Sequence, residues 1–271
     1  ALAAGRAVTP AVLGLAASQG ITTLSVHRPP TVALLVTGDE VVAPDTPTLA
    51  PGQLRDVHTP FLRAATADGD LRLPLRVLPA VADAPGALRA AIADGGRDDV
   101  LLLTGGVSRG AHDHVPDTVV ACGARIVLHR ISLQPGRPLL VARHAGGWIV
   151  GMPGNPASVM VTYRCFVRPL LRRLMGFADG FGHGARPAAL AEDASPLPPP
   201  GPRTRMLPAQ IVGSMADEAT VRVRPLRPRG SHDIVAWAQA DALLWCPSAD
   251  DAAAGRTGLR ALVDSTQIPP S

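Results

Sequence analysis

The sequence predicts an α/β fold in which a mostly parallel sheet lies between two layers of helices, followed by a small all-β domain. Apolar runs typical of buried strands alternate with helical patterns through four units of the 271-residue chain. Beyond the Pro-rich stretch ending at residue 202, the patterns are strand-like. We expect residues 1–28 to be the tail of a preceding N-terminal domain, 29–178 the α/β domain and 179–271 the β domain.

Composition narrows the class of protein. The 46% hydrophobic content supports a sizeable core. No apolar run reaches the roughly 18 residues that a membrane span needs, and the first ten residues lack a signal-peptide pattern. Cys122, Cys165 and Cys246 are far apart, which favours a reducing compartment over a disulfide framework or a Cys-based zinc site. We therefore expect a cytoplasmic protein with no membrane partner.

The charge pattern favours a small anionic ligand. The formal charge is +4, every basic residue outside histidine is Arg, and aromatic residues make up only 3% of the chain. A modest, dispersed excess of positive charge with few aromatic residues does not suit a nucleic-acid track. We expect a small-molecule ligand and no nucleic-acid partner.

The first third of the chain carries two strand patterns that end near carboxylates. A short helix ending at Gly20 and strand-like residues 21–26 precede an apolar strand at residues 31–36, which leads into Thr37-Gly38-Asp39-Glu40. Adjacent carboxylates on a glycine turn can hold a hydrated divalent cation or transfer protons, although a solvated turn has the same composition. Asp56 precedes a predicted helix through residues 61–65, as a residue near a helix start does.

The next units repeat this arrangement. Strand-like residues 71–80 lead to Asp83, and a helix is predicted over 85–94, with Pro early and glycines after it. An apolar strand at residues 100–103 then delivers the loop Thr104-Gly105-Gly106-Val107-Ser108 before residues 112–114. Glycines at the carboxyl end of a strand let backbone N–H groups approach an anion, but they also serve ordinary strand-to-helix turns.

The second half of the α/β region predicts a helix at residues 118–121, a strand from 125, the rigid loop Gln134–Pro138, and a strand at 148–150. Asn155 and Pro156 have the chemistry of a helix N-cap and first helical residue. The helix that follows places apolar residues on one face from residue 159 to 174, with arginines elsewhere. Its N-terminus can attract an anion.

The C-terminal region predicts strands at residues 220–225, 242–248 and 261–265, after a linker over 176–202. The polar turn Arg229–Asp233 is expected between strands. By its composition alone, this turn is a surface loop.

Together, five motifs give this chain a resemblance that no single glycine loop provides. TGDE at Thr37, TGGVSRGAHDH at Thr104, QPGRP at Gln134, GMPGNPAS at Gly151 and GSHD at Gly230 resemble the molybdopterin molybdenumtransferase family, the bacterial MoeA and eukaryotic gephyrin E-domain type. The resemblance implies a molybdopterin-binding α/β domain, a small β domain and two further N-terminal domains. It also implies an elongated homodimer and contacts with other proteins of molybdenum cofactor biosynthesis.

The activity implied by the resemblance is insertion of molybdenum from molybdate into adenylated molybdopterin, with release of AMP and help from a divalent cation such as Mg2+. The resemblance assigns catalytic roles to Asp39, Glu40, Asp83 and Asp113, and makes Glu40 and Asp113 metal ligands. Carboxylate oxygens suit a cation that bridges phosphates. The implied ligand-binding residues are Thr37, Gly38, Asp56, Gly105, Gly106, Ser108, Gly154, Asn155, Pro156, Ser158, Gln134, Arg137 and Ser231.

Departures from the family pattern concern the oxyanion and the acidic loop. The family's KPGKP loop has two lysines, whereas this chain has Gln134 and Arg137. Arg137 keeps a cation, but a missing cation at Gln134 weakens binding of a dianion by about 1 to 3 kcal/mol unless another group compensates. The usual Glu-Ala-Asp-Tyr is replaced at residues 111–114, and the family's DxN ends in His58. In the family, the partner's N-terminal region completes the active site, so we expect this chain to bind molybdopterin nucleotide but insert metal poorly.

Two alternatives stay open from the sequence. The glycine loop also occurs in molybdopterin adenylyltransferases and in competence-damage-type proteins that act on nucleotides. A non-catalytic molybdopterin carrier or scaffold would tolerate Gln134 freely. The GSHD turn and the GMPGNP motif together favour the transferase.

Overall fold

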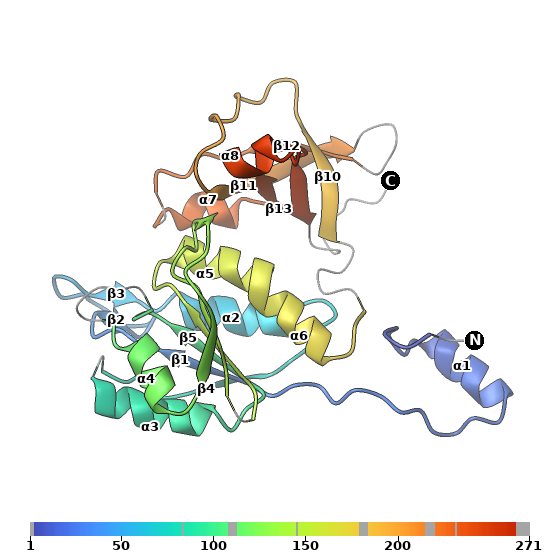
Figure 1. Ribbon diagram of the computed structural model, residues 1–271, viewed down its shortest axis with the longest axis horizontal. Coiled ribbons are helices and arrows are strands. Elements are labelled where there is room, and N and C mark those ends of the chain that lie inside the picture. Colours follow the sequence, from blue (N-terminus) through green and yellow to red (C-terminus); the bar gives the residue numbers. More distant parts are fainter. Residues whose placement is uncertain are drawn as a thin grey trace.

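The computed structural model describes residues 3–82, 84–107, 113–144, 146–178, 184–214, 220–230 and 232–263. Its two six-stranded sheets account for most of the architecture (Figure 1). None of the described helices is long and apolar enough to cross a membrane.

The first sheet has the strand order β4-β1-β5-β9-β8-β6. Its strands are β1 (Val32–Val36), β4 (Leu75–Val77), β5 (Val100–Thr104), β6 (Arg125–His129), β8 (Leu140–Arg143) and β9 (Trp148–Met152). Strands β4, β1, β5 and β9 run parallel, whereas β8 and β6 are antiparallel additions. All five residues of β1 and of β5 are buried, as expected for central strands covered on both faces.

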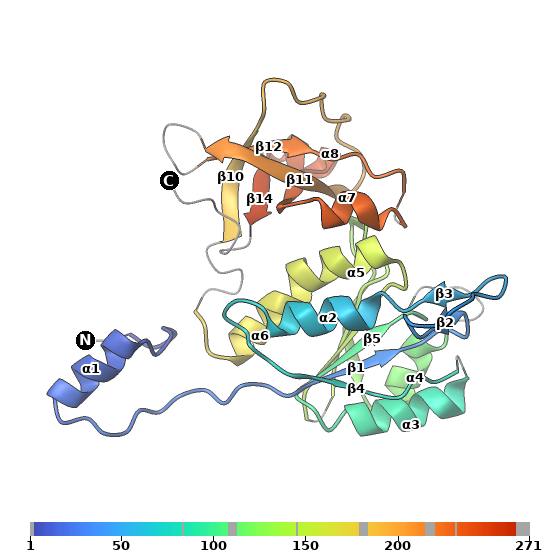
Figure 2. The same ribbon diagram turned by 180° about the vertical axis from the view of Figure 1, so that it is seen from behind.

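Helices cover both faces of this sheet (Figures 1 and 2). On one face lie α2 (His58–Ala67), α5 (Pro156–Thr162), the π-helix η1 (Tyr163–Val167) and α6 (Arg168–Leu174). On the other lie α3 (Pro85–Gly95) and α4 (Val115–Ala121). Alternate residues of β1 enter two separate cores, Leu34 towards α2 and α5, and Leu35 towards α3. The predicted three-layer arrangement is confirmed.

The second sheet has the order β12-β10-β14-β13-β11-β7. Its strands are β7 (Leu133–Gln134), β10 (Ala185–Leu190), β11 (Thr204–Ser214), β12 (Val221–Pro225), β13 (Ala242–Cys246) and β14 (Arg260–Val263). Strand β7 belongs to the QPGRP segment, so the α/β region contributes an edge strand to the C-terminal sheet. A shared core joins Val161 of α5 to Met206 and Trp237 of the C-terminal region.

The remaining elements are short or peripheral. They are α1 (Pro10–Ser18), the parallel pair β2 (Val41–Val42) and β3 (Leu54–Arg55), α7 (Ile234–Ala238) and α8 (Ala249–Ala253). Figure 1 shows α1 apart from both sheets, joined to β1 by an extended segment.

Several expected elements differ from the structure. Residues 21–26 form no strand, because their extended backbone pairs with none of the described segments and their side chains are mostly exposed. The expected linker over 176–202 contains β10, where pairing with β12 and β14 overrides the weak strand propensity of its alanines. At the end of the predicted turn, Asp233 is the N-cap of helix α7, where a strand was expected. The long amphipathic helix is present but has a π-helical middle.

The cysteines are unpaired, as predicted. Cys165 and Cys246 are buried, whereas Cys122 is half-buried. Burial raises the pKa of Cys165 to about 12 and that of Cys246 to about 11. These two thiols therefore behave as small hydrophobic side chains rather than nucleophiles.

Candidate functional site

The carboxyl ends of β1, β5 and β9 are joined by backbone hydrogen bonds. The N–H of Thr37, just after β1, donates to the carbonyl oxygen of Thr104 at 3.0 Å, and its hydroxyl donates to the same oxygen at 3.2 Å. The N–H of Gly105 donates to the carbonyl oxygen of Met152 at 3.1 Å. Three loops far apart in sequence thus begin at one edge of the sheet, where ligands bind in open α/β folds.

Glycine is required at position 105, where the loop after β5 approaches the loop after β1, and Gly154 lies against it. Gly105 has a φ of +94°, and a Cβ there would lie 2.7 Å from the carbonyl oxygen of Thr37. A Cβ on Gly154 would lie 3.5 Å from the Cα of Gly105. The structure therefore brings together Thr37, Gly105 and Gly154, three of the predicted binding residues, and leaves backbone groups accessible there.

The TGDE loop presents its carboxylates to solvent. Gly38 has a φ of +129°, and a Cβ there would lie 2.9 Å from the carboxylate of Glu40. Asp39 and Glu40 are exposed. The N–H of Leu54 in β3 donates to the carbonyl oxygen of Glu40 at 2.8 Å, which ties the loop to its neighbour.

Asp56 has a structural role at the start of α2. Its Oδ1 accepts hydrogen bonds from the N–H groups of His58 at 2.9 Å and Thr59 at 3.0 Å, which satisfies donors that a helix N-terminus leaves unpaired. The carboxylate predicted to bind ligand is therefore already used as a helix cap.

His58 reaches the centre of the loop cluster, although the sequence did not mark it as a site residue. Its side chain is 7% exposed, and its Nδ1 lies 3.2 Å from the hydroxyl of Thr104. Burial lowers the pKa of His58, while the Asp56 carboxylate and the backbone of Gly154 act in the opposite direction. The departure from the family's DxN at position 58 was the available signal, but the contact with Thr104 is visible only in the structure.

The glycine loop after β5 leads towards α4. Gly106 also has a left-handed backbone, with a φ of 60°, and its carbonyl oxygen accepts the N–H of Val115 at 3.3 Å. Asp113 is half-buried and lies two residues before α4. The Asp113 carboxylate thus follows, in the chain, the glycines whose loop is predicted to supply backbone N–H donors.

At the start of α5, Asn155 occupies the N-cap position and Pro156 the first turn, as predicted. The Asn155 side chain makes no capping hydrogen bond, however. Ser158 is 6% exposed and lies within the helix. This burial places the Ser158 hydroxyl among packed residues rather than on an open surface.

The QPGRP loop follows β7, with a cis peptide bond between Gln134 and Pro135. Gln134 and Arg137 are both exposed. A Cβ on Gly136 would lie 2.9 Å from a methyl of Thr162 in α5, so the loop packs closely on that helix. Three further predicted site residues, Asp83, Ser108 and Ser231, lie outside the described residues.

The side chains near the loop cluster suit one kind of divalent-cation site and not another. Within the described ranges, no group of three or more His, Cys, Asp or Glu side chains is arranged to hold a metal ion. Mg2+ commonly needs only one or two carboxylates, the rest of its shell being water and substrate phosphate. The exposed carboxylates of Asp39 and Glu40 fit that second kind of site.

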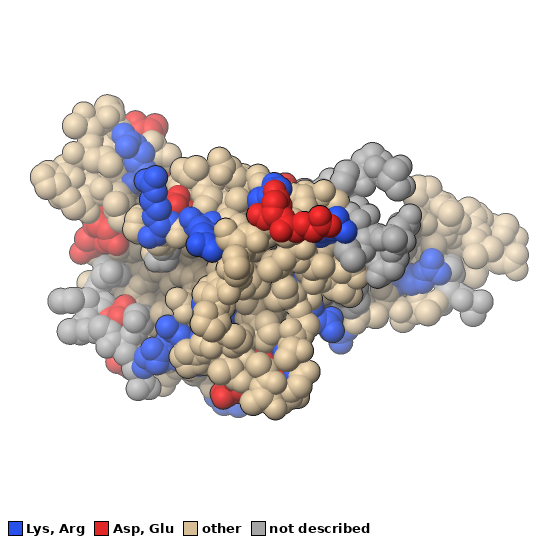
Figure 3. All heavy atoms as spheres, turned by 90° about the horizontal axis from the view of Figure 1, so that it is seen from above, with Lys and Arg blue, Asp and Glu red and all other residues tan. Residues whose placement is uncertain are grey.

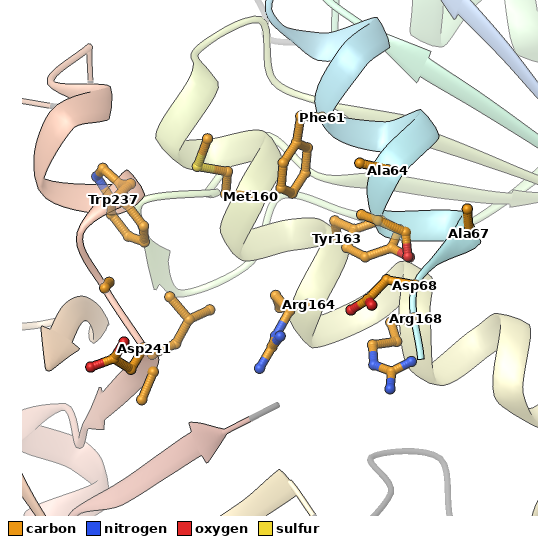
Figure 4. Close-up of a pocket in the computed structure, with 14 residues that line it drawn as sticks. Phe61, Ala64, Ala67, Asp68, Met160, Tyr163, Arg164, Arg168, Trp237 and Asp241 are labelled. Atoms are coloured by element: carbon orange, nitrogen blue, oxygen red, sulfur yellow. The ribbon is translucent and has the colours of Figure 1, made fainter. Parts of the chain in front are cut away.

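A separate cavity of about 490 Å3 lies between α2, the α5–η1 helix and the α7–β13 segment. Figure 4 shows Phe61 and Tyr163 on one side of it, with Trp237 and Asp241 on the other. Phe61 and Tyr163 pack edge to face, with ring centroids 5.8 Å apart. No predicted site residue lines this cavity, so it is distinct from the loop cluster at the strand ends.

Comparison with known proteins identifies the family. A model described as a probable molybdopterin binding domain matches residues 33–173, and one described as the MoeA C-terminal region (domain IV) matches residues 191–257. The chain belongs to the molybdopterin molybdenumtransferase family. The match to domain IV covers three of the six strands of the second sheet, β11, β12 and β13.

Individual relatives agree with this assignment. A molybdopterin molybdenumtransferase 2 from Mycobacterium tuberculosis is 36% identical over 250 residues, which cover 90% of this chain and 58% of the relative. A molybdopterin molybdenumtransferase from Nostoc sp. is 38% identical over 171 residues, covering 62% of this chain and 38% of the relative. The chain thus spans less than two thirds of the length of these relatives.

A solved structure supports the fold. The molybdopterin biosynthesis MoeA protein from Pyrococcus horikosii matches with a TM-score of 0.69 at 24% identity, covering 93% of this chain and 59% of that chain. This similarity extends over both sheets and therefore supports the predicted succession of an α/β region and a β region.

Proposed function

We propose that this chain binds adenylated molybdopterin at the carboxyl edge of the first sheet and takes part in the insertion of molybdenum from molybdate, with release of AMP. The observation that carries the proposal is the meeting of Thr37, Gly105 and Gly154 at one point. Relatives named molybdopterin molybdenumtransferase support the reaction class.

In this proposal, backbone N–H groups of the loops that follow Gly105 and Gly154 hold the phosphates. Gly105 and Gly106 have left-handed backbones, a conformation that exposes neighbouring donors. Glu40 and Asp113 are the proposed metal ligands, with Asp39 and Asp83 as further acidic groups. Mg2+ would neutralise phosphate charge as AMP leaves. The remaining proposed ligand contacts come from Thr37, Gly38, Asn155, Pro156, Ser108 and Ser231.

Two of the predicted binding residues take supporting roles. Asp56 stabilises the start of α2, and Ser158 is buried within α5. We propose that both position the loops rather than contact the ligand. We also propose domain boundaries at residues 28 and 178, a homodimer and a cytoplasmic location. Contacts with other proteins of molybdenum cofactor biosynthesis belong to the same proposal.

The C-terminal region favours this function over the alternatives considered from the sequence. The adenylyltransferase-like and competence-damage-like alternatives rest on the glycine loop of the α/β region alone, whereas this chain also matches domain IV over residues 191–257. Strand β7 joins the QPGRP loop to that second sheet. Such a connection brings the proposed oxyanion loop next to the C-terminal region.

Calorimetric titration with adenylated molybdopterin tests the proposal. We expect saturable binding that strengthens when Mg2+ is added, with only slow release of AMP when molybdate is also present, because the chain is expected to insert metal poorly. Glu40→Gln should reduce the effect of Mg2+, while Glu192→Gln, an exposed carboxylate in the C-terminal region, should not. Absence of heat at every accessible concentration would contradict the proposal, and binding without AMP release would favour the carrier.

A further inference from the structure

The glycine loop after β5 is attached to three different neighbours within three residues. The N–H of Gly105 donates to the carbonyl oxygen of Met152 in β9 at 3.1 Å. The carbonyl oxygen of Gly106 accepts the N–H of Val115 in α4 at 3.3 Å. The side chain of Val107 is 1% exposed and belongs to the core between the first sheet and the α3–α4 layer. The loop therefore has a defined path before a ligand arrives.

The absence of a side chain in β9 makes room for this path. A Cβ on Gly151 would lie 2.7 Å from Cγ1 of Val107 and 3.4 Å from Cβ of Leu140 in β8. Strand β9 lies between β5 and β8 in the sheet. Val107 thus lies over β9 and close to β8, so the loop crosses the sheet in the direction of β6 before the chain enters α4.

His129 reaches this loop from the edge of the sheet. It is the last residue of β6, and it pairs with Leu140 of β8. Its side chain is half-buried and places Nε2 3.1 Å from the carbonyl oxygen of Val107. Because a carbonyl oxygen only accepts hydrogen bonds, Nε2 carries the proton and is the donor. One imidazole thus connects the edge strand to the loop that follows the central strand β5.

The two glycines before Val107 explain why such a connection is needed. Gly105 and Gly106 have φ values of 94° and 60°, and glycine populates other backbone conformations about as readily. Ordering these residues costs conformational entropy, which lowers the affinity of a ligand that has to organise the loop itself. The hydrogen bond from His129 fixes the carbonyl group that follows the glycine pair, so the ordering takes place on folding rather than on binding.

Basic side chains are dispersed on the face of the molecule shown in Figure 3, where they form small separate groups rather than a continuous cationic surface. Arginine side chains are long and adapt to a ligand. Backbone N–H groups, in contrast, bind an anion only where the fold has already placed them. Binding that relies on the glycine loop therefore depends on the contacts that keep the loop in place.

We infer that His129 is a positioning residue for the proposed ligand, because its Nε2–H holds the carbonyl group of Val107 and keeps residues 105–107 in the shape that receives phosphate groups. The imidazole acts through the loop and does not itself contact the ligand. The inference rests on the proposed function, which names adenylated molybdopterin as that ligand. Both the neutral Nε2–H tautomer and the protonated imidazole can donate this hydrogen bond.

Two substitutions of His129 separate the hydrogen bond from other effects of the side chain. The amide nitrogen of glutamine reaches about as far as Nε2 of histidine, whereas that of asparagine reaches only as far as Nδ1. His129→Asn should therefore weaken calorimetric binding of adenylated molybdopterin about fivefold, and His129→Gln should change it less than twofold. Val127→Asn is the matched control, because Val127 is 51% exposed on the same strand, and it should also change affinity less than twofold. Chemical denaturation confirms that each variant is folded under the conditions of the titration.

A second measurement examines the loop without any ligand. Amide exchange at residues 105–107 should be faster in His129→Asn than in the unaltered chain, because the carbonyl group of Val107 has lost its donor. Exchange there should be unchanged in His129→Gln and in Val127→Asn. A merely structural role of His129 in β6 would not distinguish the two substitutions at position 129.

The outcomes are distinct. Unchanged affinity in His129→Asn overturns the inference, and so does unchanged exchange at residues 105–107. Equal weakening in His129→Asn and His129→Gln also overturns it, because the N–H donor alone would then not be sufficient. If the unaltered chain binds no adenylated molybdopterin, the proposed function fails, and faster exchange in His129→Asn alone would still show that His129 fixes the loop.

Discussion

The two ends of the first sheet treat their charged groups differently. At the amino end, Asp99 accepts two hydrogen bonds from Arg28 at 2.6 and 2.8 Å and one from the N–H of Thr31 at 2.7 Å. Arg76 bridges Asp94 and Asp98 nearby. These pairs connect the segments before β1 and β5, so charge at this end stabilises the fold.

At the carboxyl end, Asp39 and Glu40 are exposed to solvent. Left-handed glycines gather here as well, at positions 38, 105 and 106. We infer that charge at the amino end of the sheet stabilises the fold, whereas the loops at the carboxyl end are shaped to receive an anionic ligand.

The largest expected effect is at the carboxyl end. Gly105→Ala should lower the free energy of unfolding by at least about 2 kcal/mol, because it adds left-handed strain and a Cβ 2.7 Å from the carbonyl oxygen of Thr37. It should also abolish binding of adenylated molybdopterin. Gly123→Ala is the matched control, with a φ of +82° and open space around the position. Chemical denaturation of both variants measures the difference, and equal losses would show that close approach to Thr37 has no cost.

At the amino end, Asp99→Ala should lower the free energy of unfolding by roughly 2 kcal/mol through loss of charge-assisted hydrogen bonds. Binding of adenylated molybdopterin should stay within twofold. Arg28 holds the pKa of Asp99 at about 2, against a usual value of 3.8. The stability contributed by this carboxylate is therefore complete above pH 3.8 and is lost as the pH falls towards 2. Urea titrations between pH 2 and 5 would reveal this slope, and an identical slope in the variant would contradict the assignment.

At the carboxyl end of the sheet, we expect His58 to make the free energy of unfolding depend on pH, with a smaller effect than the two changes above. Because burial lowers its pKa from the usual 6.5, the unfolded chain binds a proton more readily than the folded one. The free energy of unfolding should thus decrease as the pH falls below about 6.5. His58→Gln should flatten that decrease, whereas exposed His27 provides the control variant His27→Gln. An unchanged pH profile in H58Q would show that His58 is not the responsible group.

The smallest effect on stability is expected at Gln134, because position 134 is exposed. Gln134→Lys should leave the free energy of unfolding nearly unchanged. It should raise molybdate affinity about tenfold, since it adds a cation to the proposed oxyanion loop. Titration with molybdate measures the gain, and an unchanged affinity would show that the missing cation has no cost.

The sequence predicted the first sheet and its helices better than the elements around them. Strand and helix periods, glycine turns and the alternation of elements were sufficient for the three layers, because buried strands such as residues 32–36 have an unmistakable apolar pattern. Strand β10 was missed since Ala- and Pro-rich residues become a strand only through pairing with β12 and β14. Segment 21–26 has a strand composition but no partner among the described segments, so propensity alone misled there.

At the candidate site, the sequence motifs identified the loops correctly, but they did not show which residues of these loops hydrogen-bond to each other. The loops at Thr37, Gly105 and Gly154 meet as expected from strands ending at one edge. Ligand contact by Asp56 stays a prediction, and its hydrogen bonds to the start of α2 are a matter of local geometry that the motif does not contain. The pairing of β7 with β11 could not be found from the sequence, because it joins segments about 70 residues apart and β7 is only two residues long.

Hydrogen exchange with and without adenylated molybdopterin tests the division between the two ends most directly. We expect binding to slow amide exchange at residues 37–41, 105–107 and 154–157, and to leave it unchanged at residues 28–31 and 94–99. Protection at the amino end, or protection confined to residues 64–68 and 237–243 around the separate cavity, would contradict it.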